Sequence, residues 1–403
     1  MLPTIFISAG EASGEHYGAL LADALQKQLS ASGQTVGFFG MGGERMKAAG
    51  VECVVRSEEM AVMGLTEVVR HLPRIWREYR RLKQSIRDRR PSVAVLIDFP
   101  EIHFRLAREL DRLGVPVVYF VSPQLWAWKK HRIKLVRKYI DKMLVIFPFE
   151  EPFYREQGVQ AEFVGHPLAE LPLPIISREE FAARNGLDPA KTWIGLLPGS
   201  RPKEIRDHLP EILRAADFYF HDCLEHGWTE PQFVVPLAPT LSEPQRAEVE
   251  SILANVLNRT AITVRLVNDA RAALFHARAS VVASGTATVE AALMGNPFVV
   301  VYRVSALTFA IAKRVVKVPF VAMANLIAGK QVVKELIQSD FTAANIVREI
   351  SPLIPDGLPR QMMMEELERI HGLLAKNTGA GEEESGAIER TARITLEMMR
   401  RDG

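Results

Sequence analysis

Short runs of apolar residues alternate along this chain with longer amphipathic stretches, and this alternation limits the folds that the chain can adopt. The stretches 17–29 and 74–87 repeat apolar residues at helical spacing, whereas the runs are short and have little polar alternation. Strands that are apolar on both faces and are connected by helices are typical of a parallel, doubly wound sheet. The predicted strands of the first half are Ile5–Ser8, Val36–Phe39, Val93–Ile97, Val117–Val121 and Met143–Ile146.

The alternation stops at a proline-rich segment and then starts again. Pro167, Pro172 and Pro174 lie in this break. A chain of 403 residues is long enough for two cores. We therefore expect two Rossmann-like α/β domains, 1–170 and 171–350, that face a central cleft, and C-terminal helices in 351–403 that can pack back on the N-terminal domain. The predicted strands of the second half are Trp193–Leu197, Gln232–Pro236, Ile262–Leu266, Ala279–Val282 and Pro297–Tyr302.

Composition excludes several other classes of protein. Cys53 and Cys223 match no metal-binding spacing, and two isolated cysteines are typical of a reducing compartment. The first residues lack the basic segment of a secretory signal, and no apolar run is long enough to span a membrane. The basic segments 74–90 and 129–142 match no nucleic-acid-binding motif, and the net charge is only +2. We expect a protein of the cytoplasm with no nucleic-acid partner.

Two loops of the first half carry candidate functional residues. The small and acidic loop at 10–16 follows the first strand and opens a helix, so that a ligand could approach its backbone; the alternative is a tight strand–helix turn. Asp98 follows the strand Val93–Ile97, and a carboxylate at the carboxyl end of a central parallel strand suits a general base. The alternative for Asp98 is a helix N-cap.

Two loops of the second half are suited to bind phosphates. Leu197–Arg201 ends a strand with a glycine that permits close approach and an arginine that can pair with phosphate oxygens. Ser284–Glu290 follows another strand, and its small residues leave backbone amides free at the start of a helix. Glu290, about one turn further on, is placed to accept hydrogen bonds from ribose hydroxyls. The alternatives are a surface turn with an ion-paired arginine and an ordinary capped helix.

Two segments combine apolar residues with lysines and arginines. The first includes Val62, Met63 and Leu65 and runs into the basic stretch 74–90. The second, Ala306–Ala328, contains three basic residues and no acidic one. Such segments suit contact with an anionic membrane surface. Core helices with basic outer faces are the alternative.

The motifs, taken together, resemble those of lipid-A-disaccharide synthases. They occur in that family's order from the first strand to about residue 340. No single one is decisive, but the series is specific. The matching stretches are Ala9–Gly14, Met41–Gly43, Val62–Gly64, Ser122–Trp128, Ile146–Glu150, Gly165–Pro167, Leu197–Arg201, Ser284–Glu290 and Asn325–Gly329, followed by Glu335 and Gln338.

This resemblance implies a fold, a reaction and a cellular location. The fold is GT-B, and the reaction is an inverting transfer from UDP-2,3-diacylglucosamine to 2,3-diacylglucosamine 1-phosphate, called lipid X. The product is the β-1,6-linked lipid A disaccharide 1-phosphate of Gram-negative bacteria. No Asp-x-Asp motif is present, so we expect no cofactor and no tightly bound metal beyond the UDP-sugar substrate. We expect a peripheral enzyme on the cytoplasmic face of the inner membrane, and its oligomeric state stays open, a homo-oligomer included.

The resemblance also assigns roles by position. Asp98 matches the catalytic carboxylate. The implied acceptor loop contains Gly10, Glu11, Ser13, Gly14 and Glu15. The implied donor site contains Ser200, Arg201, Ser284, Gly285, Thr286, Ala287, Thr288, Glu290, Asn325 and Gln338.

The sequence departs from the family's pattern at a few positions and leaves alternatives open. The family usually has Asp where Glu15 stands, and often Asp and Asn where Glu101 and His103 stand. His16 is not a family feature, and whether His16 or Glu101 contributes to the site stays undecided. Two other functions remain: a GT-B-like enzyme such as a UDP-N-acetylglucosamine 2-epimerase, and a nucleotide-sugar-binding regulator without turnover.

Overall fold

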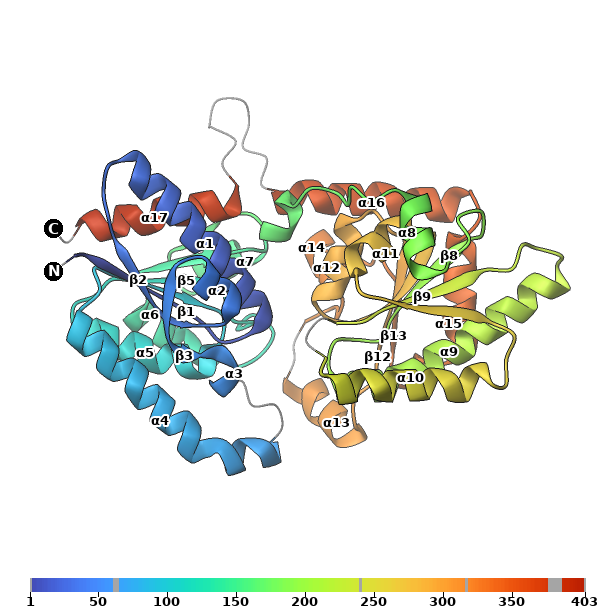
Figure 1. The fold of residues 1–403 in the computed structure, drawn as a ribbon, viewed down its shortest axis with the longest axis horizontal. Coiled ribbons are helices and arrows are strands. Elements are labelled where there is room, and N and C mark those ends of the chain that lie inside the picture. Colours follow the sequence, from blue (N-terminus) through green and yellow to red (C-terminus); the bar gives the residue numbers. More distant parts are fainter. Residues whose placement is uncertain (1, 61–64, 239–240, 316–317, 376–385, 402–403) are drawn as a thin grey trace. The chain divides into compact units, whose positions relative to one another are not determined.

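A computed structural model describes residues 2–60, 65–238, 241–315, 318–375 and 386–401. The chain divides into two compact units. The first contains residues 1–170 and 374–403, and the second contains residues 171–373. Each unit is built on its own parallel sheet, which confirms the predicted α/β fold class (Figure 1).

The first unit has a seven-stranded sheet with the strand order β3-β2-β1-β4-β5-β6-β7. Its strands are β1 (Thr4–Ala9), β2 (Gly37–Gly42), β3 (Val51–Arg56), β4 (Val93–Ile97), β5 (Val117–Phe120), β6 (Lys142–Val145) and β7 (Ala161–Phe163). Its helices are α1 (Ala12–Ala31), α2 (Glu44–Ala48), α3 (Ser57–Met60), α4 (Leu65–Arg89), α5 (Pro100–Arg112), α6 (Ile133–Tyr139), α7 (Glu150–Glu156) and α17 (Ala387–Arg401), with 3-10 turns at Lys130–Arg132 and Pro167–Glu170.

The second unit has a six-stranded sheet with the order β10-β9-β8-β11-β12-β13. Its strands are β8 (Trp193–Leu197), β9 (Gln232–Pro236), β10 (Thr263–Val267), β11 (Ala279–Ala283), β12 (Phe298–Tyr302) and β13 (Glu335–Ile337). Its helices are α8 (Arg178–Asn185), α9 (Pro202–Glu225), α10 (Glu243–Leu257), α11 (Ala270–His276), α12 (Thr286–Leu293), α13 (Ala306–Val315), α14 (Met323–Ala328), α15 (Ala343–Ile350) and α16 (Leu358–Ala375), with 3-10 turns at Gln338–Asp340 and Ser351–Leu353.

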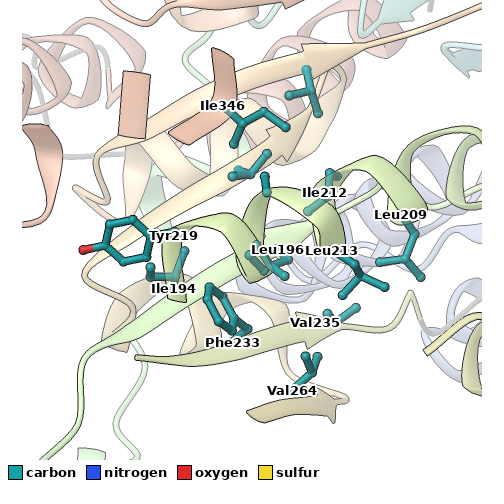
Figure 2. Packing of buried hydrophobic residues seen from close by; sticks show 14 of the residues in the cluster. Ile194, Leu196, Leu209, Ile212, Leu213, Tyr219, Phe233, Val235, Val264 and Ile346 are labelled. Carbon is teal, nitrogen blue, oxygen red and sulfur yellow. The ribbon is translucent and has the colours of Figure 1, made fainter. Parts of the chain in front are cut away.

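The central strands form because both of their faces are covered. Every residue of β4 and of β8 is buried, as expected for strands without polar alternation. In the second unit, α9 presents apolar residues at helical spacing to the sheet, and α15 packs beside it (Figure 2). Figure 2 shows the resulting cluster, which includes Ile194, Leu196, Leu209, Ile212, Leu213, Tyr219, Phe233, Val235, Val264 and Ile346.

The C-terminal segment is shared between the two units. Helix α16 belongs to the second unit up to residue 373, whereas α17 packs on α1 of the first unit. The Arg390 guanidinium donates to the carbonyl oxygen of Val164 at 2.7 Å, and the Ala387 amide donates to the Glu170 carboxylate. The last helix is therefore anchored to the end of the segment that leaves the first unit.

In each sheet, the direction in which the chain adds strands reverses once. The chain passes from β1 outward through β2 to β3 and then returns to place β4 on the other side of β1. The second sheet repeats this order, because β11 lies on the opposite side of β8 from β9. In such sheets ligands bind beyond the carboxyl ends of the strands that flank the reversal. These points are the β1–β4 pair and the β8–β11 pair.

Candidate functional site

The predicted loops of the first unit meet at its point of reversal. Ala9 pairs with Ile97 in the β1–β4 ladder, so Gly10 and Asp98 directly follow neighbouring strands. A Cβ atom on Gly10 would lie 2.3 Å from the ring of Phe99. Gly10 is thus required for the close approach of the two loops, which brings the acceptor loop and the candidate base together.

Asp98 has an unusual backbone conformation and an altered acidity. It and Phe99 both lie in the left-handed region, with φ of 50° and 49°. Burial raises the pKa of the Asp98 carboxyl to about 7, and the nearby negative charge of Glu11 adds to this effect. A carboxylate with a pKa near neutrality can accept a proton under physiological conditions, as a general base must.

The backbone of Asp98 is held by residues that sequence reasoning missed. Its carbonyl oxygen accepts hydrogen bonds from the Tyr119 hydroxyl and from Nδ1 of His103, both at 2.6 Å. Nε2 of His103 lies 2.9 Å from the hydroxyl of Ser8. Burial lowers the pKa of His103 to about 4, so the imidazole is neutral at pH 7. No sequence motif predicts this arrangement, because the atom that His103 and Tyr119 contact is the backbone carbonyl oxygen of Asp98.

The remaining residues of the acceptor loop differ in their surroundings. Glu11 and Ser13 are exposed, and Gly14 is buried. The carboxylate of Glu15 accepts hydrogen bonds from the backbone amides of Arg45 and Met46, at 2.7 and 3.0 Å, at the start of α2. Glu15 thus ties α1 to α2, and a contact between Glu15 and the acceptor stays a prediction.

His16 and Glu101, which sequence reasoning left undecided, have different environments. Burial and the charge of Arg45 lower the pKa of His16. Glu101 is exposed and pairs with Arg132 at 2.7 Å and with Lys129 at 2.9 Å. These partners, Arg132 first, hold the pKa of Glu101 at about 2. Glu101 is therefore an ion-paired carboxylate and a poor proton acceptor near pH 7.

The tryptophan loop that follows β5 combines a packed and an exposed ring. Trp126 is buried, and its indole donates to the carboxyl of Glu150 at 3.1 Å. Burial raises the pKa of Glu150 to about 8. Trp128 is 44% exposed, with the Lys129 ammonium 4.0 Å from its ring centroid. Only Trp128 of the two rings is thus accessible for stacking on a sugar.

In the second unit, the loop after β8 lies at the point of reversal. Gly199 has φ of 118°, and a Cβ atom there would lie 2.6 Å from Oε2 of Glu204. Ser200 is exposed, and Arg201 precedes α9 with a side chain 54% exposed, 3.2 Å from Glu204. Nδ1 of buried His208 lies 2.7 Å from the Pro198 carbonyl oxygen, so α9 holds this loop. The Arg201 guanidinium is accessible to an anion.

The loop after β11 presents backbone amides. Gly285 has φ of 148°, and its carbonyl accepts both the amide and the hydroxyl of Thr288, the latter at 2.7 Å. Within the described part of the chain, the amides of Gly285, Thr286 and Ala287 have no hydrogen-bond acceptor. Ser284 is partly exposed, and its hydroxyl donates to Val321 at 3.3 Å. Free amides at the start of α12 can bind a phosphate.

Glu290 lies on α12, one turn beyond these amides. Its side chain is partly buried, and burial raises its pKa, with Arg271 acting in the opposite direction. Among the described residues its carboxylate has no hydrogen-bond or ion-pair partner. This carboxylate is therefore free to accept hydrogen bonds from a ligand, and vicinal hydroxyls could supply them.

Asn325, which the resemblance places in the donor site, makes four hydrogen bonds within the chain, and its contact with the nucleotide stays a prediction. Its amide nitrogen donates to the Val333 carbonyl and to Glu335, both at 2.9 Å, and its oxygen accepts from the amides of Val332 and Val333. These four hydrogen bonds use the full capacity of its amide, so Asn325 fixes the segment before β13. Gln338 similarly pairs with both backbone groups of Val304 at 3.0 Å, but it keeps half of its capacity.

Other predicted features are not described at the level of side chains. Val62 and Met63 lie outside the described residues, and Leu65 begins α4 without a described side chain. No helix in the described part of the chain is long and apolar enough to cross a membrane. The described ranges also contain no group of three metal-ligating side chains.

Comparison with known proteins gives a consistent result. The family model described as lipid-A-disaccharide synthetase matches residues 5–382. A lipid-A-disaccharide synthase of Acidobacterium capsulatum is 58% identical over 99% of this chain and 97% of that protein. One of Koribacter versatilis is 48% identical over 98% of this chain and 99% of that protein.

Solved structures share the fold at low sequence identity. The calicheamicin glycosyltransferase CalG4 has a TM-score of 0.60 at 18% identity, and both chains are covered completely. MurG of Acinetobacter baumannii has a TM-score of 0.53 at 16% identity, covering 98% of this chain and 100% of that one. MnaA of S. aureus, solved with UDP, has a TM-score of 0.61 at 13% identity over 98% of both chains.

Proposed function

The chain belongs to the lipid-A-disaccharide synthase family, and from this premise we propose which of its residues bind the donor, which one activates the acceptor, and where the protein works. It is a glycosyltransferase that joins UDP-2,3-diacylglucosamine to lipid X. The products are the β-1,6-linked lipid A disaccharide 1-phosphate and UDP. The observation that carries the proposed mechanism is the placement of Asp98 at the point of sheet reversal, with a pKa near 7.

The donor binds to the second unit. The free amides of Gly285, Thr286 and Ala287 and the exposed guanidinium of Arg201 bind the pyrophosphate, because each can donate hydrogen bonds to its oxygens. The unpaired carboxylate of Glu290 accepts the ribose hydroxyls. When the bond between the anomeric carbon and UDP breaks, negative charge develops on the terminal phosphate. The same donors stabilise this charge, and such stabilisation is commonly the largest contribution to catalysis.

The acceptor is activated in the first unit. Asp98 removes the proton from the 6-hydroxyl of lipid X while that oxygen attacks the anomeric carbon from the face opposite UDP, so the configuration inverts. The bond from O6 to the anomeric carbon forms, the bond to UDP breaks, and the proton passes to Asp98. General base catalysis of this kind contributes about 10²- to 10⁴-fold. In the proposed mechanism Arg201 and the amides supply the positive potential at the pyrophosphate.

The enzyme works at the cytoplasmic face of the inner membrane without crossing it. Both of its substrates carry two acyl chains, and α4 has an exposed basic and aromatic surface. Trp76 is 47% exposed, Arg77 is exposed, and the Arg80 guanidinium lies 5.3 Å from the Trp76 ring centroid. On α13, Phe309 and Lys313 are exposed as well. Exposed aromatic and basic side chains on the same helix favour an anionic interface.

Release of UDP that depends on the acceptor tests this function. Purified protein is incubated with UDP-2,3-diacylglucosamine in detergent, with or without lipid X, and UDP and the disaccharide are measured by chromatography and mass spectrometry. We expect equal amounts of both products, and neither without lipid X. Turnover of UDP-N-acetylglucosamine to its 2-epimer without any acceptor would instead identify an epimerase, and binding without turnover would identify a regulator.

A further inference from the structure

The turn that carries Asp98 has an unfavourable backbone conformation, so residues outside the turn must stabilise it. Two consecutive residues with side chains, Asp98 and Phe99, have positive φ, and Pro100 follows immediately at the start of α5. Left-handed backbone is unfavourable for residues other than glycine and persists only where the surrounding structure holds it. Whatever holds this turn therefore also sets the direction in which the Asp98 carboxylate leaves the backbone.

Three buried side chains from three different elements supply this support. Tyr119 on β5 and His103 on α5 both donate to the carbonyl oxygen of Asp98, each at 2.6 Å, and thereby use both of its lone pairs. A carbonyl can only accept, so Nδ1 of His103 carries the proton. Nε2 of His103 is then the acceptor for the Ser8 hydroxyl on β1, 2.9 Å away. All three side chains are fully buried.

We propose that His103 and Tyr119 are positioning residues that act on catalysis through the Asp98 carbonyl oxygen; this inference rests on the proposed role of Asp98 as the base. Fixing the carbonyl fixes ψ of Asp98, and so fixes where its side chain points. The network achieves this without placing a charge beside the carboxyl. A cationic histidine here would stabilise the carboxylate and make it a weaker base, whereas the neutral imidazole leaves the pKa of Asp98 to burial and to Glu11.

Loss of this support has a distinctive effect on the pH profile. Besides burial, the charge of Glu11 after β1 raises the pKa of Asp98 and a hydrogen bond from the Phe99 backbone lowers it. His103 on α5 and Tyr119 on β5 contact only its backbone carbonyl oxygen, both as neutral donors. If the turn relaxes, the carboxyl gains solvent, and its pKa falls from about 7 toward its ordinary value. The acid limb of the rate profile then moves to lower pH while the maximal rate falls. Simple destabilisation of the fold would not move that limb.

The test uses His103→Leu, which removes both hydrogen bonds, and Tyr119→Phe, which removes a single hydroxyl. We expect kcat to fall by about tenfold to a hundredfold, with KM for the UDP-sugar unchanged and the acid limb of kcat shifted downward. His103→Asn keeps a donor near the carbonyl and should recover much of the rate. His166→Leu is the matched control, because His166 is equally buried in the same unit but lies after β7, at the edge of the sheet.

The outcomes separate this inference from the proposed function. The inference is refuted if folded Tyr119→Phe and His103→Leu keep the wild-type kcat and acid limb while Asp98→Asn is inactive. Equal losses of melting temperature in His103→Leu and His166→Leu with kcat retained would also refute it, by showing a purely structural role. If His103→Leu does not fold, Tyr119→Phe alone decides. If Asp98→Asn retains normal turnover, the proposed base is wrong, and the positioning role falls with it.

Discussion

Asp98 should reduce the stability of the protein at neutral pH, and replacing it with asparagine should raise that stability while turnover is lost. Its folded-state pKa of about 7 lies above its ordinary value of 3.8 because the carboxyl is buried. Between these two pH values the folded state binds more protons than the unfolded state, so the free energy of unfolding falls as pH rises. An asparagine does not ionise, and asparagine also tolerates left-handed backbone better than most residues. Both effects favour the variant.

The magnitude follows from the size of the shift. Each pKa unit corresponds to about 1.4 kcal/mol, so a rise from 3.8 to about 7 sets an upper limit of about 4 kcal/mol at and above neutral pH. The side chain keeps partial contact with solvent, so we expect roughly 1–3 kcal/mol. For a unit of this size each kcal/mol raises the melting temperature by about 2–4 °C. The gain should therefore be several degrees at pH 8, and it should shrink toward pH 5.

Melting temperatures of wild type and Asp98→Asn from pH 5 to 8 provide the assay, together with turnover, which should fall at least about a hundredfold. Glu101→Gln is the matched control three residues away. The folded-state pKa of Glu101 is about 2, so its contribution is complete above its ordinary pKa of 4.5 and is lost only below that value. Glu101→Gln should thus lower the melting temperature slightly and equally across the range, because an exposed ion pair contributes at most about 1 kcal/mol. A pH-independent difference between Asp98→Asn and wild type would refute the reasoning.

Three further predictions concern the donor site, its support and the membrane. Arg201→Ala and Glu290→Gln should each weaken UDP binding by roughly 1.5–3 kcal/mol in calorimetric titration, and unchanged affinity in both would place the nucleotide elsewhere. Asn325→Ala should lower stability by about 2–4 kcal/mol in denaturant unfolding, because it leaves the amides of Val332 and Val333 unpaired; a stable variant that has lost only UDP binding would instead support the predicted nucleotide contact. The protein should sediment with anionic vesicles, and added salt should reduce this binding only in part. Serine in place of Val62, Met63 and Leu65 should remove the fraction of vesicle binding that resists salt, while UDP binding persists. Wild-type protein that stays in the supernatant at low salt would contradict this prediction.

The sequence predicted the central strands of both sheets and missed three of the four strands that lie at the ends of the sheets. β4 and β8 were found at their observed bounds, because strands buried on both faces must be apolar throughout. The strands β3, β7 and β13 were not predicted. β3 mixes buried, half-buried and exposed residues without a regular period, and β7 and β13 have only three residues each, so none of the three stands out from a loop. All three lie at the ends of their sheets.

The candidate site was predictable in position and less so in detail. The sequence placed Asp98 and the loops at Gly199 and Gly285 after central strands, and the structure has them there; their roles stay predictions. Asn325 shows the limit of this reasoning. A matching residue in a matching motif does not reveal which atoms are already occupied, and its four hydrogen bonds became visible only in the folded structure. His103 was noted only as a departure from the family's pattern, and its partner is a carbonyl oxygen that no sequence motif records.

In each of the two units, a buried histidine holds a loop that follows a central strand. Parallel strands end at one edge, where loops must stay open to a ligand and yet keep a fixed geometry. In the first unit the imidazole of His103 connects the Asp98 carbonyl after β4 with Ser8 of β1, and in the second that of His208 connects the Pro198 carbonyl after β8 with the backbone of Arg303 after β12. A rigid ring with a polar atom on each side sets the spacing between two such segments at a fixed value. Both imidazoles are fully buried. In both units a buried imidazole thus fixes the loop that carries the candidate site residues.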